Sequence, residues 1–339
     1  MIRFLKSNID QSKKHAIKKN LPNLIIPGAQ KAGTTSLFAI LNRHENVFFP
    51  PNKEPHFLSK ASNLDNKENY WKLFSAVNEQ HSIVGDASTS YLIEPEAPIR
   101  IKKELGTDVK FIFILRNPAD RSISAFWHLY KRKIHGTLNW YENRSASTVF
   151  NSSIKDLGEF ITHEKLAIQE SLVNKKIHTR EFELQYDTPT WPFSYVENSR
   201  YRIFIERYLE HFDKSQMLFL TTEELKQDSL STFKNIASFL NIDDSTFSNT
   251  SKRFNQSVIP KKGFFNDLVH LAHPYVIKTP GFRSRKLDNK YREMYFLAPE
   301  NSVEITNFLN QLFKQENRLL GNLINKDLEQ IWGNHDENG

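Results

Sequence analysis

The sequence contains no cysteine among its 339 residues. This absence excludes disulfide bonds and cysteine-ligated metals, and it favours a cytoplasmic protein, because disulfides persist mainly in oxidising compartments. Long apolar runs are also missing. The longest clear one is FIFIL at 111–115, far short of the roughly 20 residues that a membrane-spanning helix needs. The first 20 residues lack the continuous apolar stretch of a secretory signal. We therefore expect a cytoplasmic protein without a transmembrane segment.

Net positive charge is small outside the N-terminus. Residues 1–20 hold six Lys or Arg against one acid and so carry +5 of the net charge of +7. The nearly neutral remainder argues against a nucleic-acid-binding protein, and any anion site in it must be local. We interpret residues 1–20 as a solvated basic extension. Peripheral contact with a membrane or a polyanion is the alternative.

Short apolar segments alternate with amphipathic ones along the rest of the chain. Strands are predicted at 24–26, 82–86, 109–115 and 216–222. Helices are predicted at about 34–43, 95–104, 118–133, 155–174, 196–212, 228–241 and 301–322. This alternation indicates the α/β class, with a P-loop-like, doubly wound parallel sheet flanked by helices. We expect a single domain at residues 21–333 and a tail at 334–339.

A glycine-rich segment, GAQKAGTTS at 28–36, follows the first predicted strand. It keeps the glycine spacing of a phosphate loop, but Thr34 replaces the lysine of G-x-x-x-x-G-K-[ST], and Lys31 precedes Gly33 by two residues. Its glycines allow a tight turn whose N–H groups face a phosphate at a helix N-terminus, and three consecutive hydroxyls follow. A turn that binds nothing is the alternative.

A second candidate anion site follows the strand at 109–115. Arg116 stands directly after this strand, at the edge where α/β proteins bind ligands, and Ser124 lies about two turns into the next helix. Asn117 fits the N-cap of that helix and Pro118 its first position. An ATP site with magnesium would need a carboxylate at a neighbouring strand end. A nucleotide phosphorylated at two separated positions fits these residues better, and no metal is required.

The two motifs together resemble those of sulfotransferases. GAQKAGTTS is similar to their 5′-phosphosulfate loop, and RNPADRSISAFWH at 116–128 is similar to their 3′-phosphate motif, R-[DN]-P-x-x-R-x-x-S-x-x-x-H. The resemblance covers roughly residues 22–333 and is strongest to the bacterial and carbohydrate (heparan sulfate) branch. It implies 3′-phosphoadenosine 5′-phosphosulfate (PAPS) as donor, no required metal, and a carbohydrate or other hydroxyl-bearing acceptor, with an amine as the alternative group.

The resemblance implies donor contacts in both motifs, and weaker ones in SRYRIF at 199–204 and PKKGFF at 260–265. These residues are Gln30, Lys31, Ala32, Gly33, Thr34, Thr35, Ser36, Arg116, Ser124, Tyr201, Lys262 and Gly263. For the PKKGFF segment, a solvated basic turn is the alternative.

Lys31 is the first catalytic residue that the resemblance implies. It would lie beside the bridging oxygen and stabilise the departing adenosine 3′,5′-bisphosphate. A lysine can replace magnesium in this role because a sulfuryl group carries less charge than a terminal phosphoryl group. A lysine that faces solvent is the alternative.

The segment KEPHF at 53–57 offers the base. Pro55 favours an extended Glu54, so that Glu54 and His56 would point to the same side. Glu54 is the predicted base because related enzymes have a matching glutamate; the alternative is a surface Glu54 paired with Lys53. His56 is the second choice of base, or a residue that orients the acceptor. Three nearby aromatic residues predict a raised pKa for Glu54: Phe48, Phe49 and Phe57.

One position departs from the heparan sulfate enzymes. Many of them have a lysine in a segment where this chain has Ala87, and the neighbouring Asp86 either lines the acceptor site or caps the strand. Long segments at 134–154, 176–195 and 250–300 are expected to select the acceptor. Two other functions stay open: a P-loop kinase or ATPase, and a non-catalytic polyanion-binding module.

Overall fold

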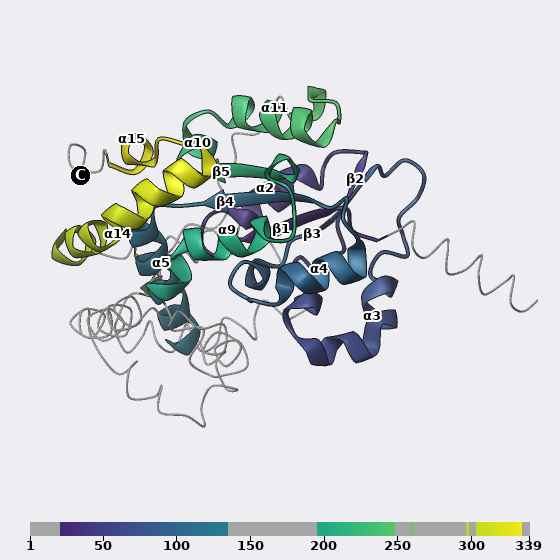
Figure 1. The fold of residues 1–339 in the computed structure, drawn as a ribbon, viewed down its shortest axis with the longest axis horizontal. Coiled ribbons are helices and arrows are strands. Elements are labelled where there is room, and N and C mark those ends of the chain that lie inside the picture. The colour runs from purple at the N-terminus through teal and green to yellow at the C-terminus, as the bar shows by residue number, and fades with distance from the viewer. Residues whose placement is uncertain (1–20, 135–194, 248–258, 261–295, 298–302, 334–339) are drawn as a thin grey trace, which may run out of the picture.

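A computed structural model describes residues 21–134, 195–247, 259–260, 296–297 and 303–333. Its main sheet has five parallel strands in the order β2-β3-β1-β4-β5 (Figure 1). The strands are β1 (Leu24–Gly28), β2 (Val47–Phe48), β3 (Ile83–Asp86), β4 (Lys110–Leu115) and β5 (Met217–Thr221). The chain runs from β1 to β2 and β3 on one side, and then to β4 and β5 on the other. The strand order therefore reverses at β1, and ligands of α/β proteins bind beyond the carboxyl ends of strands at such a point.

Helices lie on both faces of this sheet (Figure 1), which confirms the predicted fold class. The α-helices in the described part of the chain are α2 (Thr34–Leu41), α3 (Lys67–Lys72), α4 (Ala97–Leu105), α5 (Pro118–Ile134), α9 (Tyr201–Leu209), α10 (Thr222–Gln227), α11 (Ser229–Leu240), α14 (Val303–Ile324) and α15 (Leu328–Gly333). Two further short strands, β6 (Ile259–Pro260) and β7 (Phe296–Leu297), pair with each other in an antiparallel arrangement and form a separate sheet.

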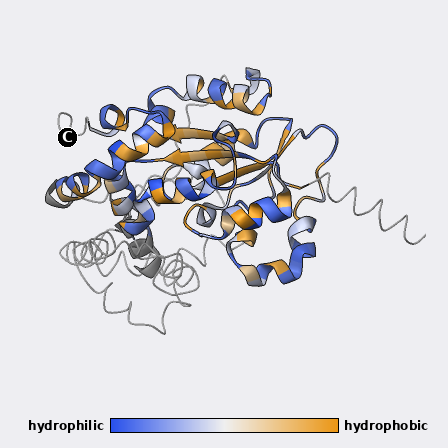
Figure 2. Cartoon of the chain, viewed as in Figure 1, coloured by the Kyte–Doolittle hydropathy of each residue, from blue (hydrophilic) through white to orange (hydrophobic). Residues whose placement is uncertain are grey.

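The side chains of β4 show why the sheet is covered on both faces. Phe111, Phe113 and Leu115 belong to a core with α4 and α9, whereas Ile112 and Ile114 belong to a core with α2 and α11. Successive side chains of a strand point to opposite faces, so a strand buried on both is apolar throughout. Figure 2 shows this apolar character along the central strands.

The predicted strands and most predicted helices are confirmed, with ends that shift slightly. The helix expected at 196–212 is shorter, because a 3₁₀ turn at Glu197–Ser199 precedes α9. The expected helix at 155–174, the extension at 1–20 and the tail at 334–339 lie outside the described residues. The short elements that were not predicted are β2, α3, α10, α15, β6 and β7, since a few residues carry too little periodic signal.

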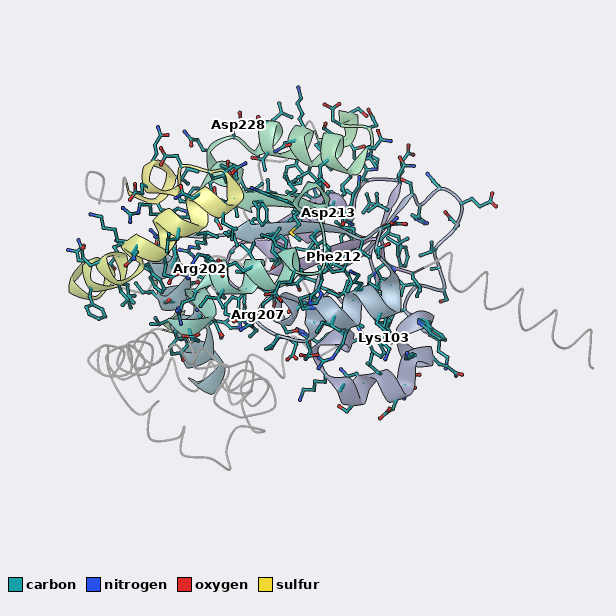
Figure 3. The ribbon with its side chains drawn as sticks, viewed as in Figure 1. Lys103, Arg202, Arg207, Phe212, Asp213 and Asp228 are labelled. Atoms are coloured by element: carbon teal, nitrogen blue, oxygen red, sulfur yellow. The ribbon has the colours of Figure 1, made fainter. Side chains whose placement is uncertain are left out.

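Side-chain hydrogen bonds cap helix α5 and connect helices α9 and α14. Asn117 caps α5 as predicted: its Oδ1 accepts a hydrogen bond from the Ala119 N–H at 2.9 Å. Arg202 on α9, labelled in Figure 3, donates from Nε to Glu316 of α14 at 3.1 Å and from Nη1 to Glu206 at 2.7 Å. Helix α14 is thus held against α9.

Among the described residues, no helix has the length and apolar character to cross a bilayer.

Candidate active site

Hydrogen bonds attach the glycine-rich loop to the end of β4. The Ala29 N–H donates to the Ile114 carbonyl at 2.7 Å. The Thr222 hydroxyl lies 2.6 Å from the Ala32 carbonyl and 3.0 Å from the Leu115 carbonyl, so it bridges the loop and the strand. Because β1 and β4 are neighbours, the loop and the residues after β4 lie at one edge of the sheet. The sequence prediction did not include Thr222.

The backbone of the loop is suited to an anion. Gly33 precedes α2 with φ 102° and provides no side-chain cap. The first N–H groups of a helix have no partner within the helix, so an anion can accept from them. Ala32 and Thr34 are buried. The other five predicted donor contacts in the loop are partly exposed: Gln30, Lys31, Gly33, Thr35 and Ser36. Lys31 has a left-handed backbone, with φ 71°.

Arg116 lies directly after β4, beside this loop edge. Its Nη2 is 3.1 Å from Asp120 Oδ2, while its Nε is buried and has no hydrogen-bond partner among the described residues. The Tyr201 hydroxyl donates to the Arg116 carbonyl at 2.9 Å, and burial raises the pKa of Tyr201, so this hydroxyl stays protonated. Ser124 is buried on α5. An unpartnered guanidinium N–H is the group that a phosphate oxygen would satisfy.

The predicted contacts at Lys262 and Gly263 lie outside the described residues, and so does most of the three segments expected to select the acceptor. The roles assigned to them stay predictions.

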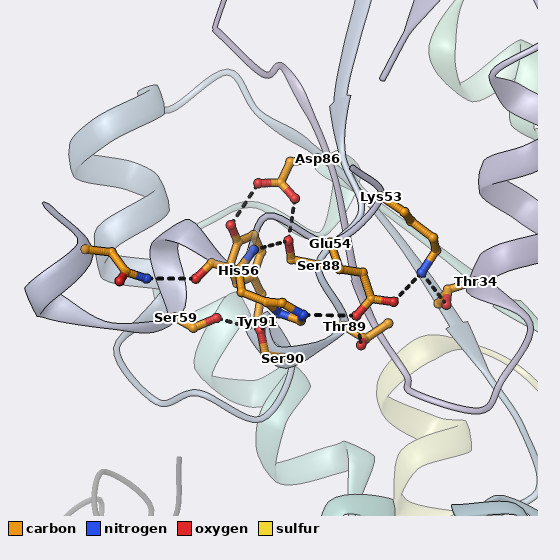
Figure 4. Close-up of polar contacts among 11 residues, drawn as sticks. Thr34, Lys53, Glu54, His56, Ser59, Asp86, Ser88, Thr89, Ser90 and Tyr91 are labelled. Carbon is orange, nitrogen blue, oxygen red and sulfur yellow. Dashed lines mark hydrogen bonds and ion pairs between the residues drawn. The ribbon is translucent and has the colours of Figure 1, made fainter. Parts of the chain in front are cut away.

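Glu54 lies at the centre of a polar cluster (Figure 4). Its Oε1 is 2.5 Å from Lys53 Nζ, and its Oε2 is 3.3 Å from His56 Nε2. The expectation that Glu54 and His56 point to the same side is confirmed, although His56 itself has a left-handed backbone with φ 53°. Lys53 Nζ also donates to Thr34 Oγ1 at 3.3 Å. The cluster therefore touches the first residue of α2.

Hydroxyls that follow β3 support this cluster from the other side. Thr89 Oγ1 donates to Glu54 Oε2 at 2.8 Å, and Ser90 Oγ lies 2.6 Å from His56 Nδ1. If Nε2 carries the imidazole proton, His56 donates to Glu54 and accepts from Ser90. The sequence prediction did not assign Thr89 or Ser90. Their position after a strand that ends at the same sheet edge was the available signal.

The prediction of a raised pKa for Glu54 is wrong. Burial does raise it, but the hydrogen bond with His56, the charge and hydrogen bond of Lys53 and the hydrogen bond from Thr89 together lower the pKa of Glu54 to about 2. Glu54 is therefore ionised at neutral pH. Since its folded pKa is below the ordinary 4.5, its stabilisation of the fold is present above about pH 4.5 and is lost as the pH falls toward 2.

The aromatic residues thought to surround Glu54 pack elsewhere. The Phe57 ring stacks on Tyr70 with 4.3 Å between centroids, and Phe49 packs on Phe38 at 5.0 Å. Phe48 lies against Phe74 at 6.4 Å. Hydrophobic rings adjacent in sequence were therefore no guide to the environment of the carboxylate.

Asp86 is fully buried behind the cluster and does not line a binding surface. Its oxygens accept hydrogen bonds from the Tyr70 and Tyr91 hydroxyls, both at 2.8 Å, and from Ser88 Oγ at 2.7 Å. Burial raises the pKa of Asp86, and these hydrogen bonds only partly oppose the shift. Ser88 Oγ in turn accepts from the His56 N–H at 2.9 Å. Asp86 thus helps to fix the segment that carries His56.

Removing the Tyr91 hydroxyl should destabilise the fold. This hydroxyl donates to Asp86 and accepts from the Leu58 N–H at 3.1 Å, so Tyr91→Phe takes this acceptor from the buried Leu58 N–H and leaves Asp86 with two of its three hydroxyl donors. We expect a loss of about 1.5–3 kcal/mol, measured by urea unfolding, because hydrogen bonds to charged groups are worth about that much. Tyr208→Phe, which removes a bond to the Tyr91 carbonyl, should cost only about 1 kcal/mol. Equal losses in the two variants would contradict a special contribution from Asp86.

Comparisons with known proteins bear on this arrangement. The family described as "Sulfotransferase domain" matches residues 21–316. The bifunctional heparan sulfate N-deacetylase/N-sulfotransferase 1 of Caenorhabditis briggsae is 25% identical over 320 residues, which cover 93% of this chain and 31% of that protein. This chain thus spans about a third of the length of that relative.

Two further proteins are similar to this chain. Heparan sulfate glucosamine 3-O-sulfotransferase 5 of Homo sapiens is 25% identical over 241 residues, covering 70% of this chain and 59% of that protein. The crystal structure of a sulfotransferase from Alicyclobacillus acidocaldarius aligns with a TM-score of 0.56 and 21% identity, covering 92% of this chain and 98% of that one. At this identity the structural match establishes a common fold.

Proposed function

The chain belongs to the sulfotransferase family, and from this premise we propose that it moves a sulfuryl group from PAPS to a carbohydrate-like acceptor. The accepting group is a hydroxyl, with an amine as the second choice. One observation carries the proposal: the loop after β1 and Arg116 after β4 lie at one edge of the sheet, with the Lys53, Glu54 and His56 side chains next to the loop.

The residues at this edge fit a donor with two separate anionic groups. The N-terminus of α2 and the hydroxyls of Thr35 and Ser36 are suited to the 5′-phosphosulfate. The unpartnered Nε of Arg116 is suited to the 3′-phosphate. Tyr201 holds the Arg116 carbonyl and so fixes the backbone at this second corner. Two separate anion sites suit a bisphosphorylated adenosine better than ATP.

The chemistry needs a base, a stabilised leaving group and a proton path. PAPS supplies a sulfuryl group on a phosphate that leaves readily. Glu54 takes the acceptor proton as the new sulfur–oxygen bond forms, and Lys31 stabilises the negative charge that remains on the phosphate when the old bond breaks. Thr89 and His56 hold the carboxylate in place through their hydrogen bonds. A water-excluding acceptor site would complete the arrangement.

Calorimetry separates this proposal from a P-loop kinase or ATPase. The protein should bind adenosine 3′,5′-bisphosphate without magnesium and should bind it more tightly than Mg-ATP. Tight binding of Mg-ATP with no binding of the bisphosphate would overturn the proposal.

Deletion of residues 1–20 should spare sulfuryl transfer, whereas a polyanion-binding module led by that segment would lose its function.

The proposed acceptor class comes from the relatives, which act on heparan sulfate according to their names. Labelled PAPS should be incubated with three groups of acceptors: unsulfated heparan-type oligosaccharides, lipids and small phenols. We expect label on the oligosaccharides. Label confined to the other two groups would refute a carbohydrate acceptor while leaving sulfuryl transfer intact.

Arg116→Ala should weaken donor binding about 10–100-fold, since a charged hydrogen bond contributes about 1.5–3 kcal/mol. The measurement is the dissociation constant of adenosine 3′,5′-bisphosphate by calorimetry. Lys103→Ala is the control. Lys103 is an exposed residue of α4 (Figure 3), so this substitution removes one positive charge at a position outside the loop. An unchanged affinity in Arg116→Ala would show that Arg116 does not hold the 3′-phosphate.

A further inference from the structure

Lys53 links the two halves of the site. Its Nζ lies 3.3 Å from Thr34 Oγ1, at the start of the helix that would hold the 5′-phosphosulfate, and 2.5 Å from Glu54 Oε1 (Figure 4). Its side chain is only 16% exposed, so it does not extend freely into solvent. Its ammonium group therefore contacts both the start of helix α2 and the proposed base.

Strand β3 and the residues that follow it, 87–90, contribute no lysine or arginine to this site. The residue after β3 is Ala87, which is fully buried and carries no charge. The residues that follow it supply hydroxyls, namely Ser88, Thr89 and Ser90. Lys53, which comes from another segment, places a positive charge in hydrogen-bond contact with both Thr34 and the base.

We propose that Lys53 is a second catalytic cation, which leaves Glu54 when the donor binds and contacts the non-bridging oxygens of the sulfuryl group. This inference rests on the proposed function and assigns a further residue to the same site. Lys31 then stabilises the leaving phosphate, while Lys53 stabilises the charge on the group in transit. Atoms balance as before: one sulfur–oxygen bond breaks, another forms, and the acceptor proton goes to Glu54.

The same movement would prepare the base. In the free protein, burial raises the pKa of Glu54, but the hydrogen bond with His56 and the charge of Lys53 are among the effects that lower it to about 2. A carboxylate with so low a pKa is a weak base. If the donor draws Lys53 away, one lowering influence is lost and the pKa of Glu54 rises. Donor binding would thus increase the basicity of Glu54 only when there is a group to transfer.

The test compares Lys53→Ala and Lys53→Arg with wild type. Two readouts are used: label transfer from PAPS to an unsulfated heparan-type oligosaccharide, and slow hydrolysis of PAPS, which needs no acceptor. Calorimetry with adenosine 3′,5′-bisphosphate, which lacks the sulfuryl group, reports the phosphate contacts alone. Lys67→Ala is the matched control, because Lys67 also forms a partly buried ion pair, with Glu104 at 2.7 Å, on a helix away from the loop.

We expect Lys53→Ala to lower kcat about 10–100-fold, a lower range than for a full oxyanion donor, while the affinity for the bisphosphate changes less than threefold. Lys53→Arg should recover part of the loss. The acid limb of the kcat/KM profile should move to higher pH in Lys53→Ala, since removal of a positive neighbour raises the pKa of Glu54.

Three results would overturn the assignment. A Lys53→Ala variant with near-normal kcat would show that Lys53 is not catalytic. An equal loss of bisphosphate affinity and kcat would make Lys53 a phosphate ligand only. An equal loss in Lys67→Ala would show a general effect of ion-pair removal. A wild-type protein that neither binds the bisphosphate nor turns over PAPS would instead refute the proposed function itself, and this inference with it.

Discussion

Lys31→Ala should lower kcat for sulfuryl transfer by about 10²–10³-fold, the range lost when a preorganised donor to a developing negative charge is removed. Lys31 lies in the loop between β1 and α2, two residues before Gly33. Stabilisation of the leaving phosphate matters most in the transition state, so kcat should fall more than the affinity for adenosine 3′,5′-bisphosphate. Single-turnover kinetics with labelled PAPS measures the chemical step directly.

Lys31→Gln is the companion to this variant, because it keeps most of the side-chain length and removes the charge. Both variants should unfold at the same urea concentration as wild type, since Lys31 is partly exposed. Turnover within a few-fold of wild type in both would remove Lys31 from the mechanism. A parallel loss of turnover and stability would instead indicate damage to the loop.

The second large effect is expected at the base. Glu54→Gln should fold and bind the donor but lose about 10²–10⁴-fold in transfer, the contribution typical of a positioned general base. Gln keeps the shape of the carboxylate and can still accept from Thr89 and His56, but it cannot take a proton. The measurement is kcat for label transfer, with calorimetry on the bisphosphate as the test of an intact donor site.

The pH profile gives an independent readout for Glu54. With its pKa lowered to about 2, Glu54 is deprotonated throughout the neutral range, so the wild-type kcat/KM should show no acid limb from this group above about pH 4. Retained transfer in Glu54→Gln would move the base role to His56, whose Nε2 lies 3.3 Å from the same carboxylate. His56→Asn would then carry the large loss.

Local chemistry was enough to predict the loop and the capped helix that carry the two candidate anion sites. The spacing of glycines and hydroxyls at 28–36 and the Arg116–Asn117–Pro118 order each follow from rules that act over a few residues, namely turn geometry, helix capping and strand periodicity. The apolar run FIFIL at 111–115 likewise predicted a strand, which the structure shows to be buried on both faces. The structure confirmed these elements with small shifts at their ends.

The environment of Glu54 was not predictable in this way. Its sequence neighbours include aromatic rings, which suggested a raised pKa, yet the groups that set its pKa include Thr89, 35 residues further along the chain. The rings themselves turn into the core against Tyr70, Phe38 and Phe74. The order of the strands in the sheet decides which distant hydroxyls reach the carboxylate. The hydrophobic pattern of a single sequence does not specify that order.

The sequence by itself therefore determined the α/β class, the glycine turn that leads into a helix and the identity of the family motifs, because each depends on residues close together in the chain. Only the tertiary structure decided that Lys53 contacts both Thr34 and Glu54, that Thr222 ties the loop to β4, and that Asp86 is buried. The physical reason is that electrostatic and hydrogen-bond energies depend on distance in space, which folding sets between segments far apart in sequence.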